Sequence, residues 1–327
     1  MNSIQQDIEI FDLFSQLEKW LDQQIVGQPK LINRLLMALL ADGHLLVEGP
    51  PGLAKTKAIK ILSSVIEGDF HRIQFTPDLL PGDITGTDIF RPQTGEFEFQ
   101  QGPIFNSLIL ADEINRAPAK VQSALLEAMA ERQISIGQKS YPLPDLFLVM
   151  ATQNPLEQEG TYPLPEAQLD RFLLHVNVAY PNSDSEQLIL KLVRDEITHT
   201  ETIPPFQKLS QTQLFAARKA VMNLHMSEAV ETYLIQLVMA TRQPDSYCKE
   251  LASWIEFGVS PRATIALDRC ARAHAFLAGK DHVSPDDVQS VVFDIFRHRL
   301  LLSFNAEAKG LTKDDITHRI LELVPVA

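Results

Sequence analysis

The sequence predicts an α/β fold, in which a parallel sheet with helices on both faces precedes an all-helical domain. Two observations predict the sheet: short apolar runs alternate with helical patterns, and a Gly/Pro-rich turn joins one apolar run to a helix at residues 45–56. This is the pattern of strand–helix units in a parallel sheet. From Pro181 onward the pattern is nearly all helical. We therefore expect an α/β domain at residues 1–180 and a helical domain at residues 181–327.

The elements of the first domain follow in order along the chain. Residues 3–40 form two helical patterns broken at 25–29, and Leu13, Leu17 and Leu21 recur at four-residue spacing, which predicts a stripe packed on the core. Further helices are expected at 57–66 and 120–132, strands at 70–75, 107–113, 146–151 and 173–178, and hairpins at 89–99 and 133–141. Helix starts in the second domain are marked by N-cap residues at Ser210, Ser227, Ser260, Ser284 and Thr312.

The composition is that of a globular chain with an acidic balance. The 327 residues are 45% hydrophobic and 22% charged, with a net charge of −13. Sequence-independent binding of nucleic acid needs a basic surface, so we expect no nucleic-acid partner. The short cluster Arg297-His298-Arg299 is interpreted as a solvated helix face. No apolar run reaches the roughly 20 residues of a membrane helix, and no signal-peptide pattern is present. Because Cys248 and Cys270 lack metal-ligand spacing, we expect two small buried hydrophobes in a reducing cytoplasm.

The turn after the first apolar run has the residues of a phosphate-binding loop. Its sequence is Gly49-Pro50-Pro51-Gly52-Leu53-Ala54-Lys55-Thr56. Backbone N–H groups of such a turn and of the following helix bind phosphate, Lys55 reaches the terminal phosphates, and the Thr56 hydroxyl can bind Mg²⁺. Ala54 replaces the usual glycine, a change that costs little if residue 54 is already helical, because only a position of positive φ demands glycine. The alternative is an ordinary Gly/Pro turn.

A pair of carboxylates follows a second apolar run. Asp112 and Glu113 end the run that starts at Ser107, and the carboxyl ends of parallel strands are where ligands bind in open α/β sheets. Asp112 is therefore a candidate for holding Mg²⁺ through water, and Glu113 for polarising an attacking water. A solvated Asp-Glu turn is the alternative, but the phosphate loop upstream favours a nucleotide site.

Three further polar residues could complete this site. Asn154 follows the next strand, beside the acids in a parallel sheet, where it could hold the attacking water; otherwise it caps a turn. Arg262 lies in the first turn of a helix in the second domain and could contact phosphate, or be solvated. Arg171 precedes the final strand and could complete a neighbouring subunit's site, or pair locally with Asp170.

With these residues in place, the chain resembles the MoxR family of AAA+ ATPases. The resemblance extends from residue 25 to residue 263 and rests on segments 25–28, 49–56, 112–117, 151–155, 164–172 and 258–263. It implies a P-loop AAA+ core with a five-stranded parallel sheet, followed by a helical lid, and ATP and Mg²⁺ as cofactors. The hairpins then match the helix-2 insert and the pre-sensor-1 hairpin of this AAA+ clade.

The resemblance also implies a role for each candidate residue. Lys55 and Thr56 become Walker A residues, and Asp112 and Glu113 become Walker B residues. The remaining roles are sensor 1 for Asn154, arginine finger for Arg171, sensor 2 for Arg262, and adenine-pocket lining for Val26 and Gly27.

The family resemblance implies an ATP-hydrolysing, chaperone-like remodelling protein. Members typically form ring hexamers and act, often with a von Willebrand factor A domain protein, in the maturation or metal loading of client complexes. The alternatives are a nucleic-acid motor or the motor subunit of a metal chelatase. We also hypothesise that Phe97 and Phe99 contact a client or partner; alternatively, both pack under their hairpin.

Overall fold

A computed structural model describes residues 3–137, 139–156, 159–198 and 204–326. Its centre is a five-stranded sheet with the strand order β2-β5-β8-β1-β9, and every neighbouring pair in it is parallel. The strands are β1 (Leu45–Glu48), β2 (Phe70–Gln74), β5 (Leu108–Asp112), β8 (Leu148–Gln153) and β9 (Leu174–Asn177). The predicted parallel five-stranded sheet is therefore confirmed.

Helices cover both faces of this sheet. Leu45 and Val47 belong to a core cluster shared with α2 (Pro29–Leu40) and α3 (Lys55–Val65). Leu46, between them, belongs to a second cluster with α5 (Ala119–Glu131). Successive strand residues point to opposite faces, which explains why β1, β5 and β8, buried on both sides, consist mainly of apolar runs.

The second half of the chain is mainly helical. Its helices are α7 (Ser183–Thr198), α8 (Gln211–Asn223), α9 (Glu228–Arg242), α10 (Lys249–Trp254), α11 (Pro261–Leu277), α12 (Pro285–Phe296), α13 (Phe304–Ala308) and α14 (Lys313–Leu323). Short strand pairs lie between them, β10 (His225–Met226) with β12 (His282–Val283), and β11 (Ile255–Phe257) with β13 (Leu301–Leu302). Predicted N-caps accept a backbone N–H at Ser210, Ser227, Ser260 and Thr312.

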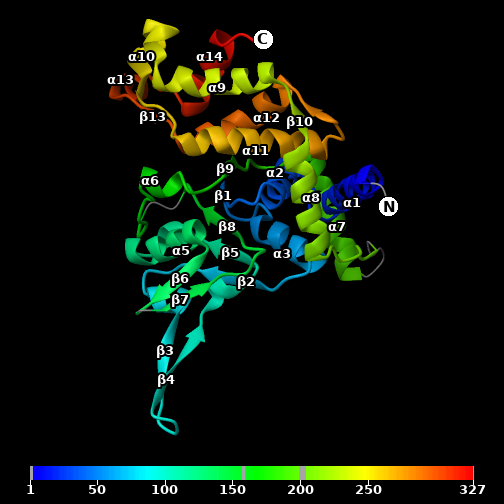
Figure 1. Ribbon diagram of the computed structural model, residues 1–327, viewed down its shortest axis with the longest axis vertical. Helices are drawn as coiled ribbons and strands as arrows, with labels where there is room; N and C mark the ends of the chain where they lie inside the picture. Colours follow the sequence, from blue (N-terminus) through cyan, green and yellow to red (C-terminus); the bar gives the residue numbers. More distant parts are fainter. Residues whose placement is uncertain (1–2, 138, 157–158, 199–203, 327) are drawn as a thin grey trace.

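The helical half shares a core with the sheet. One cluster of buried residues extends from Ile10 in α1 (Ser3–Gln24), through one face of the sheet, to Val324. Arg34 of α2 and Asp294 of α12 form a buried ion pair at 2.8 Å, and α11 packs on α2. In Figure 1 the layer containing α9, α11 and α12 lies above α2 and the sheet. The boundary at residue 180 stays a prediction.

Two hairpins extend from the core. β3 (Gly86–Arg91) pairs with β4 (Glu96–Gln101), and β6 (Gln133–Ile136) pairs with β7 (Lys139–Pro142). Both predicted hairpins are thus confirmed, although Gln138 of the second turn lies outside the described residues. Figure 1 shows β3 and β4 projecting from the end of the molecule opposite α9 to α14.

The remaining elements are short. They are the helices α4 (Pro81–Thr85) and α6 (Glu166–Leu169), and 3₁₀ turns at Pro103–Phe105, Ile114–Arg116 and Pro244–Ser246. Among the helices that the structure describes, none is both long enough and apolar enough to cross a membrane.

The basic cluster after α12 corrects one prediction. His298 is 2% exposed and the side chain of Arg299 is also 2% exposed, so the interpretation of Arg297-His298-Arg299 as a solvated helix face is wrong. α12 ends at Phe296, and the cluster then turns onto β9, where Arg297 donates to the carbonyl of His175 at 2.7 Å. The cysteines differ as well, because Cys270 is buried as expected whereas Cys248 is only half-buried.

Candidate active site

The phosphate loop connects β1 to α3. At Gly49 an added Cβ would lie 2.6 Å from the carbonyl oxygen of Val178, so only glycine fits between the strands there. The first N–H groups of a helix have no partner inside it, and those of α3 border the loop. Lys55 begins α3, and its ammonium group donates to the carbonyls of Gly49 at 2.6 Å and of Gln153 at 3.3 Å. The lysine is thereby held between the loop and the end of β8.

Ala54 does not have the helical conformation on which the small cost of replacing glycine depends. Its φ is 56° and its ψ is 16°, in the left-handed region, directly before the first helical residue. The expectation that Ala54 costs little is therefore wrong in its premise, because a Cβ in this region costs about 1 kcal/mol. The turn must reverse the chain immediately before α3, and this reversal demands a left-handed residue whatever its side chain.

Asp112 is oriented by residues of both neighbouring strands. Thr152 of β8 donates its hydroxyl to one carboxylate oxygen at 2.6 Å, and Arg72 of β2 pairs with the other at 2.7 Å. Neither Thr152 nor Arg72 was identified from sequence. Because their role depends on which strands become neighbours, no local pattern marks them.

Glu113 lies just past the strand in a left-handed conformation, with a φ of 57°. Its backbone N–H donates to the hydroxyl of Thr152 at 2.9 Å. Its carboxylate accepts from Gln74 of β2 at 2.8 Å and pairs with Arg116 at 3.3 Å. Non-glycine residues in this region are retained where surrounding contacts fix them, often at functional sites, and Glu113 has such contacts.

Asn154 is buried directly after β8, and β8 is the neighbour of β5. The structure therefore brings Asn154 to the same edge of the sheet as Asp112 and Glu113. Its side-chain oxygen accepts from the N–H of Leu156 at 3.1 Å, so it also caps a turn, the alternative that we considered. This contact fixes the side chain, and the amide nitrogen is then the group that can face a nucleotide.

An apolar pocket of about 380 Å³ adjoins the phosphate loop. Val26 lines it, but Gly27 does not; with a φ of 84°, an added Cβ at Gly27 would lie 3.1 Å from the Cβ of Pro181. Sequence reasoning missed the far wall, which is formed by Tyr180, Pro181, Ile189, Leu192 and Val193. The apolar periodicity of α7 was the pattern that could have revealed it.

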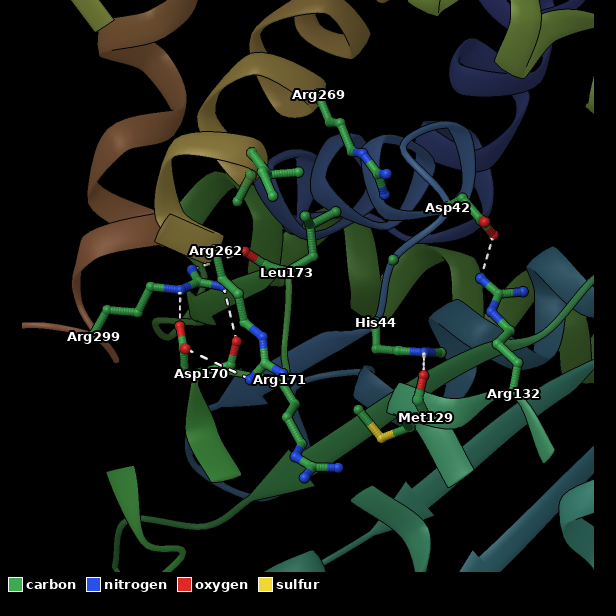
Figure 2. Close-up of a pocket in the computed structure, with 13 residues that line it drawn as sticks. Asp42, His44, Met129, Arg132, Asp170, Arg171, Leu173, Arg262, Arg269 and Arg299 are labelled. Carbon is green, nitrogen blue, oxygen red and sulfur yellow. Dashed lines mark hydrogen bonds and ion pairs between the residues drawn. The ribbon is translucent and has the colours of Figure 1, made fainter. Parts of the chain in front are cut away.

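Arg171 and Arg262 lie elsewhere, in a pocket of about 300 Å³ (Figure 2). This pocket also includes His44 and Leu173, the residues immediately before β1 and β9. The pocket thus lies at the amino ends of β1 and β9, whereas the phosphate loop follows the carboxyl end of β1. β1 has four residues, which separate the two ends by roughly 13 Å. The structure does not bring either arginine to Lys55.

Asp170 organises this second pocket. Its carboxylate pairs with Arg299 at 2.7 Å, accepts the hydroxyl of Ser260 at 2.8 Å, and lies 3.7 Å from Arg262. Arg171 instead donates to the carbonyl of Leu126 at 2.7 Å. The arginines that pair with the carboxylate of Asp170 in Figure 2 are therefore Arg299 and Arg262 of the helical half, and not Arg171.

The residues at the carboxyl edge fit a nucleotide with Mg²⁺. The described residues contain no group of three or more His, Cys, Asp or Glu that could hold a metal alone. Mg²⁺ is commonly bound by one or two protein oxygens together with phosphate oxygens and water, which Thr56 and Asp112 could supply. The apolar pocket beside Gly52 has the character of a purine-base site.

Comparisons with known proteins agree with this geometry. Residues 44–174 match the family model of the ATPase family associated with various cellular activities (AAA), and residues 251–320 match the AAA lid domain. The chain is 46% identical to Chaperone MoxR1 of Mycobacterium tuberculosis over 303 residues, which cover 92% of this chain and 78% of the relative. The chain belongs to the MoxR family of AAA+ ATPases.

Two other relatives cover nearly the whole chain. Protein MoxR of Paracoccus denitrificans is 33% identical over 310 residues, which cover 89% of each protein. The crystal structure of a presumed ATPase from Cytophaga hutchinsonii is 45% identical, with a TM-score of 0.90 over 99% of this MoxR-family chain and 97% of that one. The AAA+ fold with its helical lid is thus shared along the whole length.

Proposed function

We propose that this MoxR-family protein hydrolyses ATP with Mg²⁺ at a site formed between two copies of the chain in a ring. One observation carries the proposal: the phosphate loop and the pair Arg171 and Arg262 lie at opposite ends of the same parallel strands. An arginine that cannot reach its own loop can still supply charge to a neighbour's nucleotide.

Each residue at the carboxyl edge then has a distinct task. Lys55 and the N–H groups of the loop would hold the terminal phosphates, while Thr56 and Asp112 would hold Mg²⁺, which would supply positive charge to the phosphate oxygens. The Glu113 carboxylate accepts a hydrogen bond from the attacking water and so orients it. Asn154, held in place by Leu156, contacts the same water or the outermost phosphate.

Arg171 contributes from the adjacent protomer. Its guanidinium stabilises the charge that develops on the transferred phosphoryl group, and such arginines increase the rate by roughly 10³–10⁵-fold. Arg262 lines the same pocket, so we place it on the same side of the subunit interface. The interface thus joins the amino edge of one sheet to the carboxyl edge of the next, and repeated head-to-tail contacts of this kind close into rings; by family resemblance we propose a hexamer.

Mixing two inactive variants tests this arrangement. Arg171→Ala should bind ATP normally and hydrolyse it poorly, whereas Lys55→Ala should lose ATP affinity. In a mixed ring, some intact Arg171 side chains of the Lys55→Ala protomers face intact loops of the Arg171→Ala protomers, and ATPase activity should partly return. If the subunits exchange but activity does not return, or if dilution to monomers leaves the specific activity unchanged, the proposal is wrong.

The work that ATP hydrolysis drives is, we propose, chaperone-like remodelling of protein complexes in the cytoplasm. The net charge of −13 supports a protein client over nucleic acid. A von Willebrand factor A domain partner and a role in metal or cofactor insertion follow from the family resemblance alone. Low-salt filter binding to single-stranded DNA tests the nucleic-acid alternative, and tight binding would favour it.

The β3–β4 hairpin is the proposed client or partner contact. Phe97 is 70% exposed and lies 5.3 Å from Phe90, itself 50% exposed, between ring centres. Phe99 instead stacks on Tyr141 of the second hairpin at 4.2 Å. Exposed aromatic pairs on a projecting hairpin are typical of interaction sites. We therefore propose that Phe97 and Phe90 contact the client or partner, and that Phe99 packs against the second hairpin instead.

A pull-down with a Glu113→Gln variant, which should retain ATP and bound partners, tests the hairpin. Adding Phe97→Ser should remove captured partners without lowering the melting temperature, because an exposed ring contributes little to folding. The matched control, Phe99→Ser, should lower the melting temperature because it removes a stacked ring. Unchanged capture by the Phe97→Ser variant would exclude this surface.

A further inference from the structure

Asp170, the residue before Arg171, is bound from two separate elements of the helical half. Ser260, the N-cap of α11, donates to one carboxylate oxygen at 2.8 Å. Arg299, which follows α12, donates to the other at 2.7 Å. The short segment that carries Arg171 is therefore attached to the lid through Asp170, although it belongs in sequence to the α/β half.

Arg299 also binds the backbone of this segment. Its guanidinium donates to the carbonyls of Phe172 at 2.5 Å, Leu173 at 3.2 Å and Asp170 at 3.3 Å. His298 lies 3.0 Å from the carbonyl of Phe172 through Nε2. Burial holds the pKa of His298 well below its ordinary value, so the neutral ring donates from Nε2 to this carbonyl. Two consecutive lid residues thus hold residues 170–173 on both sides of Arg171.

The burial of Arg299 limits what it can do. With a side chain only 2% exposed, it cannot contact a nucleotide on another protomer, whereas Arg171 is partly exposed at the pocket. Its effect on catalysis must therefore pass through the segment that it holds. Ser260 starts the helix that carries Arg262, so Arg171 and Arg262 depend on the same attachment at Asp170.

We propose that Arg299 is a positioning residue that fixes Arg171 to the lid, so that the lid of one protomer controls ATP hydrolysis in the neighbouring protomer. This inference rests on the proposed function of Arg171 in the adjacent site. The planar guanidinium supplies several donors at fixed angles to Asp170 and three carbonyls, and a lysine ammonium cannot reproduce that set. Arg299→Lys keeps the buried charge paired but loosens the segment.

The test combines this variant with the mixing experiment. Arg299→Lys alone should bind ATP as the wild type does, while its turnover falls about 10- to 100-fold, the loss expected when a catalytic group is misplaced by about 1 Å. Mixed with Lys55→Ala, activity should return as it does for Arg171→Ala, because the Arg299→Lys protomers keep usable loops and receive Arg171 from their neighbours.

The matched control is Arg272→Lys. Arg272 of α11 pairs with Asp268 at 2.8 Å and does not touch residues 170–173, so its conservative replacement should leave ATPase activity at the wild-type level. If Arg299→Lys does not fold, as judged by circular dichroism and thermal unfolding, Asp170→Asn replaces it in the same mixture. That variant removes the ion pair but keeps the contacts of Arg299 with the carbonyls of residues 172 and 173, and the same rescue is expected.

The outcomes separate this inference from the proposed function. Full activity of Arg299→Lys, loss of its ATP affinity, or failure of rescue while Arg171→Ala is rescued would overturn the inference alone, because Arg299 would then serve only its own protomer. Failure of the Arg171→Ala mixture would overturn the proposed function, and the inference with it.

Discussion

The two ends of the parallel sheet differ in the chemistry of their side chains. The carboxyl end carries the phosphate loop, the acids Asp112 and Glu113, and an apolar pocket. The amino end carries a pocket whose lining includes Arg132, Arg171, Arg262, Arg269 and Arg299. We propose that the first end binds a nucleotide and orients water, and that the second supplies positive charge.

The separation of these ends explains why we propose a shared site. Within one chain, the roughly 13 Å length of a four-residue strand keeps the arginines from the loop. A second copy placed head to tail removes that distance. In the proposed arrangement, the two halves of one catalytic apparatus are built rigidly into a single sheet and meet only when two copies assemble.

The largest expected effect sharpens the assignment of the carboxyl end. Glu113→Gln should lower turnover by about 10²–10⁴-fold, the usual contribution of a positioned acid–base group, with ATP affinity unchanged because the loop is intact. Steady-state ATPase assays and ATP titration measure the two quantities. Lys55→Ala is the matched comparison and should lose affinity, and a normal rate for Glu113→Gln would contradict its role.

At the amino end, His44 should make the protein sensitive to acid. Burial lowers the pKa of His44 to about 4, and the nearby Arg132 adds to the effect. In the folded protein the Nδ1 atom of the ring accepts the N–H of Val149. The unfolded chain, with a pKa near 6.5, binds the proton more readily, so this stability is fully present above about pH 6.5 and is lost as pH falls toward 4. The loss amounts to about 3 kcal/mol.

Chemical denaturation between pH 7 and pH 4 measures this loss, and the non-titrating variant His44→Gln is the control. The wild type should lose stability more steeply than His44→Gln over that range. Parallel pH profiles of the two proteins would show that His44 is not the responsible group.

Arg262→Ala tests whether the amino end acts on a neighbour. A charged hydrogen bond to phosphate contributes about 2 kcal/mol, so turnover in the assembled protein should fall roughly 30-fold. The affinity of a diluted, monomeric protomer for ATP should not change. Weaker ATP binding by that monomer would mean that Arg262 reaches its own loop, and the contrast between the two ends would fail.

The smallest effect concerns the loop itself. Ala54→Gly should raise the free energy of unfolding by about 0.5 to 1 kcal/mol, because it relieves a left-handed alanine. Ala58→Gly, in the helical interior of α3, is the matched control and should lower stability by about 1 kcal/mol. Urea denaturation measures both, and destabilisation by Ala54→Gly would show that the turn is not strained.

Much of the carboxyl end was predictable because its parts are local. A strand, a Gly/Pro turn and a helix start occupy residues 45–56, and neighbours in sequence determine such a turn. The acids and Asn154 needed one more step, the adjacency of parallel strands, which the alternation of strands and helices supports. The conformation of Ala54 was mispredicted because residue type alone does not report where a chain must reverse.

By itself, then, the sequence determined the class of fold and the family, and it predicted the phosphate loop and the acids. Only the tertiary structure decided that Arg262 lies with Arg171, that α7 closes the apolar pocket, and that Phe97 is exposed while Phe99 is stacked. It also showed that the basic cluster Arg297-His298-Arg299, which we predicted to be solvated, contains the buried Arg299 that attaches the lid to Asp170. The physical reason is that burial of a charge depends on a partner far along the chain: Arg299 is stable in the interior because Asp170 and backbone carbonyls 126 to 129 residues away accept its hydrogen bonds.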